Sequence, residues 1–177
     1  TDPDSEAWRQ LRYWSDTLAD RPDPLTFPVD RRPYGERTAA GATVPVQVDA
    51  GTHAELTMVA RACGASLFMV MQAAWALFLS RFGRSDDVVF ATAVSGRTDP
   101  AVDKLVGCFA DDVILRVRLD NEMTFADLVA RVRLAALGGY ANPDISNQTL
   151  QRELGTDEPL FQVQFILQPG GGRIEFD

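Results

Sequence analysis

Residues 64–97 read GASLFMVMQAAWALFLSRFGRSDDVVFATAVSGR, and this stretch decides the fold. Ser66 is a favoured N-cap residue, and apolar side chains then follow on nearly every side as far as Phe82. We therefore predict a helix that lies deep in the fold and stops at Gly83. The run from Asp87 to Val94 is rich in valine and predicts a buried strand directly after the helix.

On the N-terminal side of this stretch, Thr52 and Glu55 have the spacing of a capping box. They predict a second helix, which Gly64 can close as the left-handed residue past its end. Before it, valines alternate with polar or small residues, which predicts a half-buried strand. These valines are Val44, Val46 and Val48.

The first 41 residues read as an entry segment. Residues 5–19 carry apolar side chains at helical spacing and predict an amphipathic helix. Residues 21–41 are broken by four prolines, which fix φ and remove donors, so we expect an extended connector. The remainder, residues 42–177, then forms the main unit.

On the C-terminal side, residues 112–119 alternate and predict a strand whose wetter face carries Arg116 and Arg118. Thr124 and Asp127 also have the spacing of a capping box and predict the start of another helix. We expect Gly138-Gly139 to end that helix. Further predictions are a short helix over 145–154, a strand over 160–167, a turn at 170–172 and a last strand over 173–176. Helices mixed with separated strands predict an α/β sandwich with a mixed sheet.

Composition limits the classes of function. The 177 residues are 46% hydrophobic and 24% charged, as in an ordinary globular domain. The net charge of −8 argues against a nucleic-acid partner. No apolar run reaches the length of a membrane span and no secretory leader is evident, so no membrane association is expected. Cys63 and Cys108 are expected to be buried, reduced thiols, which fits a cytoplasmic location.

No catalytic constellation is evident from the residues. The single histidine, His53, falls in the first turn of a predicted helix, where a side chain is usually solvated. No cluster of His and Cys residues suggests a metal, and Gly170-Gly171-Gly172 lacks the context of a phosphate-binding loop. The acidic pairs Asp86-Asp87 and Asp111-Asp112 are expected to be solvated strand ends. Residue types alone therefore indicate a soluble α/β domain without catalytic or metal residues.

Several stretches together resemble the C-terminal lobe of nonribosomal peptide synthetase condensation domains. Residues 12–33, RYWSDTLADRPDPLTFPVDRRP, resemble the family's helix and proline-rich connector, and residues 64–97 resemble its long apolar helix and Gly-Arg strand. LVGCFADDVILRV (105–117) resembles the family's Val/Ile-Gly-x-Phe-Val-Asn-Thr motif. YANPDIS (140–146) and DEPLFQVQFILQ (157–168) resemble two later motifs, in the family's order.

The resemblance implies one lobe of a chloramphenicol-acetyltransferase-like fold, with the active site in a cleft between two lobes. The family's catalytic His-His-x-x-x-Asp-Gly motif belongs to the N-terminal lobe and does not occur here. The chain would then be a truncated C-terminal lobe of a condensation domain that forms amide bonds, and would be inactive alone. Its implied partners are a peptidyl carrier protein bearing a phosphopantetheine thioester, the N-terminal lobe and an adenylation domain.

The resemblance also places residues beside the cleft. Gly107 and Phe109 match the family's pattern, whereas Asp111 and Asp112 replace its usual Asn and Thr. Asn142 and Asp144 match a second cleft motif whose other polar positions differ. The cleft-lining residues implied by the resemblance are Gly107, Phe109, Asp111, Asp112, Asn142 and Asp144.

Arg97 corresponds to a family arginine that pairs across the lobes with the aspartate of the catalytic motif. A charge buried between lobes needs a partner. Without that partner, Arg97 is expected to be exposed or to use Asp99 or another carboxylate, and an ordinary loop arginine is the alternative.

Three functions remain open from the sequence. The first is a wall of the condensation cleft that also serves as a platform for the adenylation domain. The second is a catalytically inactive, condensation-like binding module that recruits a tailoring enzyme. The third is a stand-alone acyltransferase that oligomerisation completes and that would require His53. Arg31, Arg32 and Arg37 are candidate contacts for an acidic carrier protein, although a solvated loop is the simpler interpretation.

Overall fold

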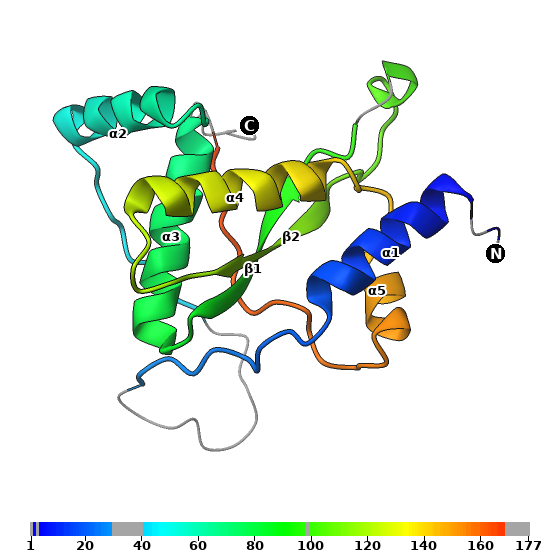
Figure 1. Ribbon diagram of the computed structural model, residues 1–177. Coiled ribbons are helices and arrows are strands. Elements are labelled where there is room, and N and C mark those ends of the chain that lie inside the picture. Colours follow the sequence, from blue (N-terminus) through cyan, green and yellow to red (C-terminus); the bar gives the residue numbers. More distant parts are fainter. Residues whose placement is uncertain (1, 3, 30–40, 98–99, 169–177) are drawn as a thin grey trace.

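The computed structural model describes residues 2, 4–29, 41–97 and 100–168 (Figure 1). The predicted turn at 170–172, the predicted strand at 173–176, and Arg31, Arg32, Arg37 and Asp99 lie outside the described residues. The elements, in chain order, are α1 (Glu6–Leu18), α2 (Ala50–Ala62), α3 (Leu67–Gly83), β1 (Asp87–Val94), a 3-10 turn (Pro100–Val102), β2 (Asp111–Arg118), α4 (Phe125–Tyr140) and α5 (Asn147–Glu153).

The strands β1 and β2 form an antiparallel pair, with Phe90 opposite Leu115 in the register. A segment of the predicted strand 160–167 joins the other edge of β1 in the parallel direction. Ala91 N donates to Val163 O (3.0 Å), and Phe165 N donates to Ala91 O (2.8 Å). The pairing directions are therefore mixed, as predicted, although the third segment is a single bridge rather than a strand.

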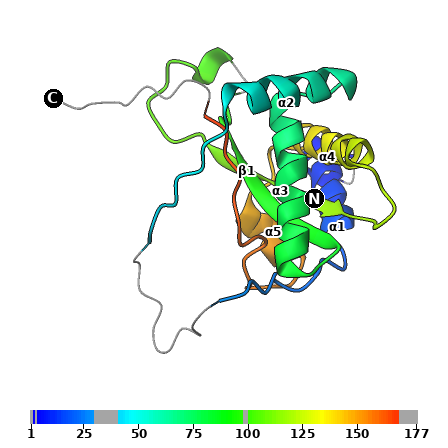
Figure 2. The ribbon, with the colours of Figure 1, turned by 90° about the vertical axis from the view of Figure 1, so that its left-hand side faces the viewer.

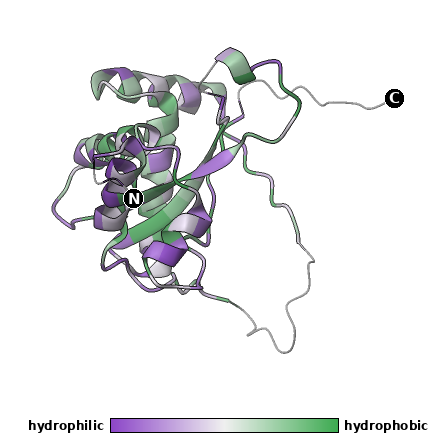
Figure 3. Cartoon of the chain, turned by 90° about the vertical axis from the view of Figure 1, so that its right-hand side faces the viewer, coloured by the Kyte–Doolittle hydropathy of each residue, from purple (hydrophilic) through white to green (hydrophobic). Residues whose placement is uncertain are grey.

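The core lies between the sheet and two helices. Helix α4 packs along β2, and α3 packs against both α4 and β1 (Figures 1 and 2). The strands are hydrophobic through their middle, where burial is greatest (Figure 3). Fully buried side chains from these four elements include Val70, Leu79, Val88, Phe90, Leu115, Val117, Leu128 and Val132.

Local capping sets where the helices begin. The Ser66 hydroxyl accepts from Met69 N, and Thr124 with Asp127 forms the predicted capping box of α4. For α2 the predicted cap was wrong, because Asp49 caps the helix and accepts from Thr52 N at 2.9 Å. Aspartate is the stronger N-cap residue of the two, so the helix begins earlier than the capping-box spacing indicated.

Helix α3 is less buried than its composition predicted. Its last helical residue is Gly83, and the left-handed residue is Arg84, with φ 51°. Phe78 and Phe82 are 43% and 51% exposed. They continue a row of aromatic rings that we call the aromatic row, formed by Phe68, Phe165, Trp75, Phe78 and Phe82.

No single helix within the described residues is long and apolar enough to span a membrane. Helices α2 and α3 reach that length and composition only as a pair, and they bend by 102° where they meet.

The strand predicted over 44–48 is absent. Val44 and Val46 are 83% and 85% exposed, and residues 41–49 have no regular secondary structure. Within the described residues, none of the strands lies beside this segment. Alternation alone predicted the strand wrongly because a strand also needs a partner for its backbone hydrogen bonds.

Gly138 and Gly139 do not end α4, which continues to Tyr140. A Cβ on Gly138 would lie 2.3 Å from the Tyr13 hydroxyl oxygen, and one on Gly139 would lie 2.4 Å from a Val113 methyl. The glycine pair therefore serves close packing of α4 against α1 and β2 rather than termination.

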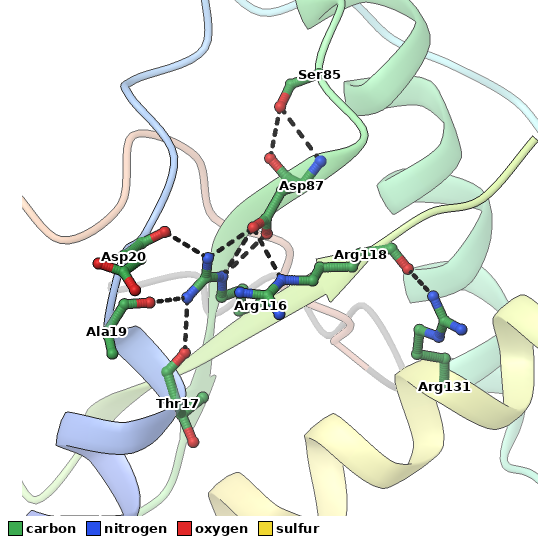
Figure 4. A network of polar contacts seen from close by, with 8 residues as sticks. All are labelled: Thr17, Ala19, Asp20, Ser85, Asp87, Arg116, Arg118 and Arg131. Carbon is green, nitrogen blue, oxygen red and sulfur yellow. Dashed lines mark hydrogen bonds and ion pairs between the residues drawn. The ribbon is translucent and has the colours of Figure 1, made fainter.

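A buried ion pair attaches α1 to the sheet (Figure 4). The Arg116 side chain, 5% exposed, binds the Asp87 carboxylate at 2.7 Å. It also donates to the carbonyls of Thr17, Ala19 and Asp20 at the end of α1. The predicted wetter face of β2 is thus covered at Arg116, and Asp87 is not the solvated carboxylate that was expected.

Candidate functional site

The β1–β2 loop, residues 95–110, carries three of the residues implied for the cleft. Arg97 donates to the carbonyl oxygens of Leu105 (3.0 Å) and Gly107 (3.3 Å), and also to that of Val102. Its guanidinium carbon lies 4.4 Å from the centre of the Phe109 ring. Arg97 is therefore half-buried within its own loop, and no carboxylate contacts it among the residues described.

The base of this loop depends on Gly96. Its φ of +62° is a conformation that residues with a side chain rarely adopt. A Cβ at this position would lie 1.7 Å from the Phe109 carbonyl oxygen. The chain therefore passes Phe109 at a distance that only glycine permits.

Asp111 and Asp112 lie at the start of β2, opposite Val94 and Ala93. The Asp111 carboxylate accepts from Asp112 N at 2.8 Å. The Asp112 carboxylate accepts from the side-chain amide of Gln164. The second aspartate is therefore held by the segment that pairs with β1, a contact that sequence reasoning missed.

Asn142 and Asp144 follow α4, and both contact α1. Asn142 is buried, and its backbone oxygen accepts from Trp14 Nε1 at 2.8 Å. Asp144 exchanges two hydrogen bonds with the Gln10 side chain, at 2.8 and 2.9 Å. The side chain of Asn142 also accepts from Arg9 Nη1 at 3.3 Å.

The sequence does carry a signal for Gln10. It lies four residues before Trp14 and eight before Leu18, so all three share the buried stripe of α1. The amide is buried there because Asp144 satisfies both its donor and its acceptor.

The structure brings the two implied cleft segments to one end of the sheet. Gly139 lies against Val113, so the turn after α4 is close to the first residues of β2. The β1–β2 loop rises from the same end (Figure 1). The polar groups there are largely engaged with one another or with α1.

Groups able to transfer protons at neutral pH are scarce in the described part of the chain. His53 is exposed in the first turn of α2, as expected. Burial raises the pKa of the Tyr13 and Tyr140 hydroxyls, with hydrogen bonding opposing this in each case, so both stay protonated at neutral pH. Residues 2, 4–29, 41–97 and 100–168 contain no group of three or more His, Cys, Asp or Glu that could hold a metal. Cys63 and Cys108 are free thiols, but Cys63 is only half-buried and Cys108 is exposed, so the expected burial is wrong for both.

The condensation-domain family model matches residues 4–174. The chain belongs to the condensation-domain family. The match includes every helix and strand described above, and the expected likeness to this family is confirmed.

Similar proteins include nonribosomal peptide synthetases. The chain is 40% identical over 181 residues to a probable non-canonical nonribosomal peptide synthetase, CymA, of Salinispora arenicola, covering 99% of the chain and 2% of CymA. It is 34% identical to a dimodular nonribosomal peptide synthase of Bacillus subtilis, covering 94% of the chain and 7% of that protein. The chain thus corresponds to a small segment of these relatives.

A solved structure with a similar fold is the X-domain from teicoplanin biosynthesis. The TM-score is 0.85 at 28% identity, and the match covers 92% of this chain and 37% of that one. The first condensation domain of the CDA synthetase has a TM-score of 0.75 at 25% identity, covering 95% and 36%. These likenesses support an α/β, condensation-like fold.

Proposed function

We propose that this chain forms the C-terminal lobe of a condensation domain in a nonribosomal peptide synthetase. It would provide one wall of the cleft in which an amide bond forms between a carrier-bound thioester and an amine. The observation that carries the proposal is the family match over residues 4–174, whose motif segments converge at one end of the sheet.

In this role, the loop end of the sheet faces the N-terminal lobe. Gly107, Phe109, Asp111 and Asp112 border the cleft from one side, and Asn142 and Asp144 fix the turn after α4. The N-terminal lobe supplies the catalytic histidine motif. A carrier protein delivers its phosphopantetheine thioester as substrate, and an adenylation domain packs nearby.

Reconstitution tests this function. The N-terminal lobe of a condensation domain is added to the chain, and amide formation from carrier-bound substrates is followed by mass spectrometry. We expect product only when both lobes are present. Bound lobes that give no product, even with D111N and D112T restoring the family's residue types, would contradict the catalytic role. R133Q on the exposed side of α4 is the matched control.

A second candidate is a binding module that recruits a tailoring enzyme. The likeness to the X-domain, with a TM-score of 0.85, suggests this candidate, although a four-domain nonribosomal peptide synthetase has a TM-score of 0.82. That X-domain is also known in a complex with OxyB. Affinity capture with the chain as bait distinguishes the two candidates. Recovery of a tailoring enzyme without carrier protein favours a binding module, and recovery of carrier protein opposes it.

The stand-alone acyltransferase stays a third prediction without structural support in its favour. It requires His53 and activity of the chain without the N-terminal lobe, so full activity of a H53A variant assayed in the absence of that lobe would exclude it.

A further inference from the structure

The connection between β1 and β2 is long for a compact domain. It spans residues 95–110, and loops of more than about 12–15 residues without their own regular structure are uncommon. The described part of this one, residues 95–97 and 100–110, extends away from the body of the molecule (Figures 1 and 2). Among its described residues, 95–97 and 100–110, the turn Pro100–Val102 is the one regular element, and Leu105 N donates to Val102 O at 3.1 Å. Side-chain contacts must therefore hold the rest of the loop in its conformation.

The Arg97 side chain connects several parts of this loop. The guanidinium of Arg97 reaches carbonyl oxygens at three separate points along the loop, while the Phe109 ring lies against it. We call this group the Arg97 clamp: Arg97, the carbonyls of Val102, Leu105 and Gly107, and the ring of Phe109.

The chemistry of the clamp is specific to arginine. A guanidinium is planar, carries five N–H donors around its edge and presents a flat face that stacks on aromatic rings. Here the edge binds the carbonyls and the cation lies over Phe109. A lysine ammonium has three donors on one atom and no flat face, so it cannot reproduce both interactions.

The base of the loop is fixed independently of the guanidinium. The close passage of Gly96 beside the Phe109 carbonyl brings the two ends together. Ser95 Oγ accepts from Arg97 N at 3.4 Å. The clamp therefore closes a loop whose ends are already joined, which lowers the entropic cost of ordering it.

We propose that Arg97 positions its own loop, in addition to the pairing across the lobes that the family resemblance implies. It holds residues 102–109 in one shape and presents the exposed side chains of Leu105 and Val106 outward as a preformed apolar tip. That this shape matters for amide formation rests on the proposed function; the clamp itself does not.

The sequence supplies a direct measurement. Lys104 is the single lysine of the chain, it is exposed, and it precedes Leu105, whose carbonyl the clamp holds. A lysine-specific protease therefore cuts only at the Lys104–Leu105 bond. The rate of cutting reports how often the loop opens, because a protease needs several residues in an extended conformation.

We expect R97Q to raise the cutting rate at this bond by about tenfold or more, since several charge-assisted hydrogen bonds are lost. R133Q removes the same charge from the exposed face of α4 and should cut at the wild-type rate. R97Q that cuts no faster than wild type would overturn the proposal.

Two further variants keep the test decisive if R97Q fails to fold. F109L removes the stacked ring but keeps the guanidinium, and an intermediate increase in rate is expected. R97K keeps the charge, and its two cut sites are separated by mass spectrometry. We expect R97K to open the loop almost as far as R97Q. Wild-type rates in F109L and R97K would show that charge, rather than the clamp, is what matters.

The proteolysis result is independent of catalysis. If R97Q opens the loop but leaves amide formation unchanged in the reconstituted two-lobe assay, the proposed clamp is supported. That result would instead contradict a role for this loop in the proposed cleft.

Discussion

The Arg116 side chain connects helix α1 to both strands of the sheet. Its guanidinium neutralises Asp87 and also binds three carbonyls at the end of α1, where the helix leaves acceptors without partners. The same residue therefore holds a helix end, a strand and a buried charge together.

We expect R116M to lower the free energy of unfolding by about 2–3 kcal/mol, because the carbonyl oxygens at the end of α1 lose their donor, while Asp87 keeps Arg118 as a partner. Urea denaturation measures the change. R118Q is the matched control, because Arg118 binds the same carboxylate but is 63% exposed. Its expected cost is at most about 1 kcal/mol. Similar losses for both variants would contradict the role given to Arg116.

The acceptors of Arg116 and Arg97 could not be predicted from the sequence. Period-two alternation placed Arg116 on a solvated face, and the resemblance gave Arg97 a partner in the other lobe, whose motif does not occur in this sequence. Their acceptors are mainly main-chain carbonyls, which every residue carries, so no pattern of residue types reveals them. Asp112 and Asp144 were found by motif, but their partners Gln164 and Gln10 lie 52 and 134 residues away.

At the scale of elements, most local signals predicted the helices correctly, except for the cap of α2 and the glycine stop of α4, whereas alternation predicted one strand wrongly. Ser66, Thr124 and the apolar stripes predicted α3 and α4 well, because capping and periodicity act within a few residues. The segment 44–48 has the alternation of a strand and forms none. Pairing depends on a distant neighbour, which the local pattern does not contain.

The capping box of α4 gives a prediction about stability. T124A should lower the free energy of unfolding by about 1 kcal/mol, because an N–H at the start of the helix loses its acceptor. Thermal or urea unfolding measures it. N121A, at an exposed position in the preceding turn, serves as the control and should have little effect. Equal stability of T124A and wild type would show that the box does not hold the helix start.

The same box predicts a pH dependence. Hydrogen bonds from Thr124 lower the pKa of Asp127 below its ordinary value of 3.8. A depressed carboxyl pKa stabilises the fold above the unfolded-state pKa and loses that effect as pH falls through the folded-state pKa. The difference in unfolding free energy between wild type and D127N should therefore be constant near neutral pH and shrink below about pH 4. A difference independent of pH would contradict this assignment.

Across the whole molecule, burial is uneven. The sheet and the inner sides of α3 and α4 form a closed core, whereas the aromatic row ends in Phe78 and Phe82 at the surface. Ile166 and Leu167 are also exposed. Exposed apolar patches larger than scattered single residues are unusual on monomeric proteins.

The chain should therefore bind a hydrophobic dye such as ANS in its native state. We expect F78S/F82S to reduce the dye fluorescence by roughly half or more, since these two rings supply the exposed end of the row. L134S removes a still more exposed apolar side chain from α4, outside the aromatic row, and should change the dye fluorescence little. Equal effects of the two variants would mean that the dye does not bind the row.

The acceptors of the Arg97 clamp have an evolutionary consequence. Substitution at positions 102 and 105 leaves the carbonyl oxygens in place, so the clamp itself does not restrict those side chains in related proteins. The arginine and the glycine before it have no such freedom, because replacing either one changes the geometry of the whole loop. Lineages that retain this loop should therefore vary at its tip and keep Gly96-Arg97 unchanged.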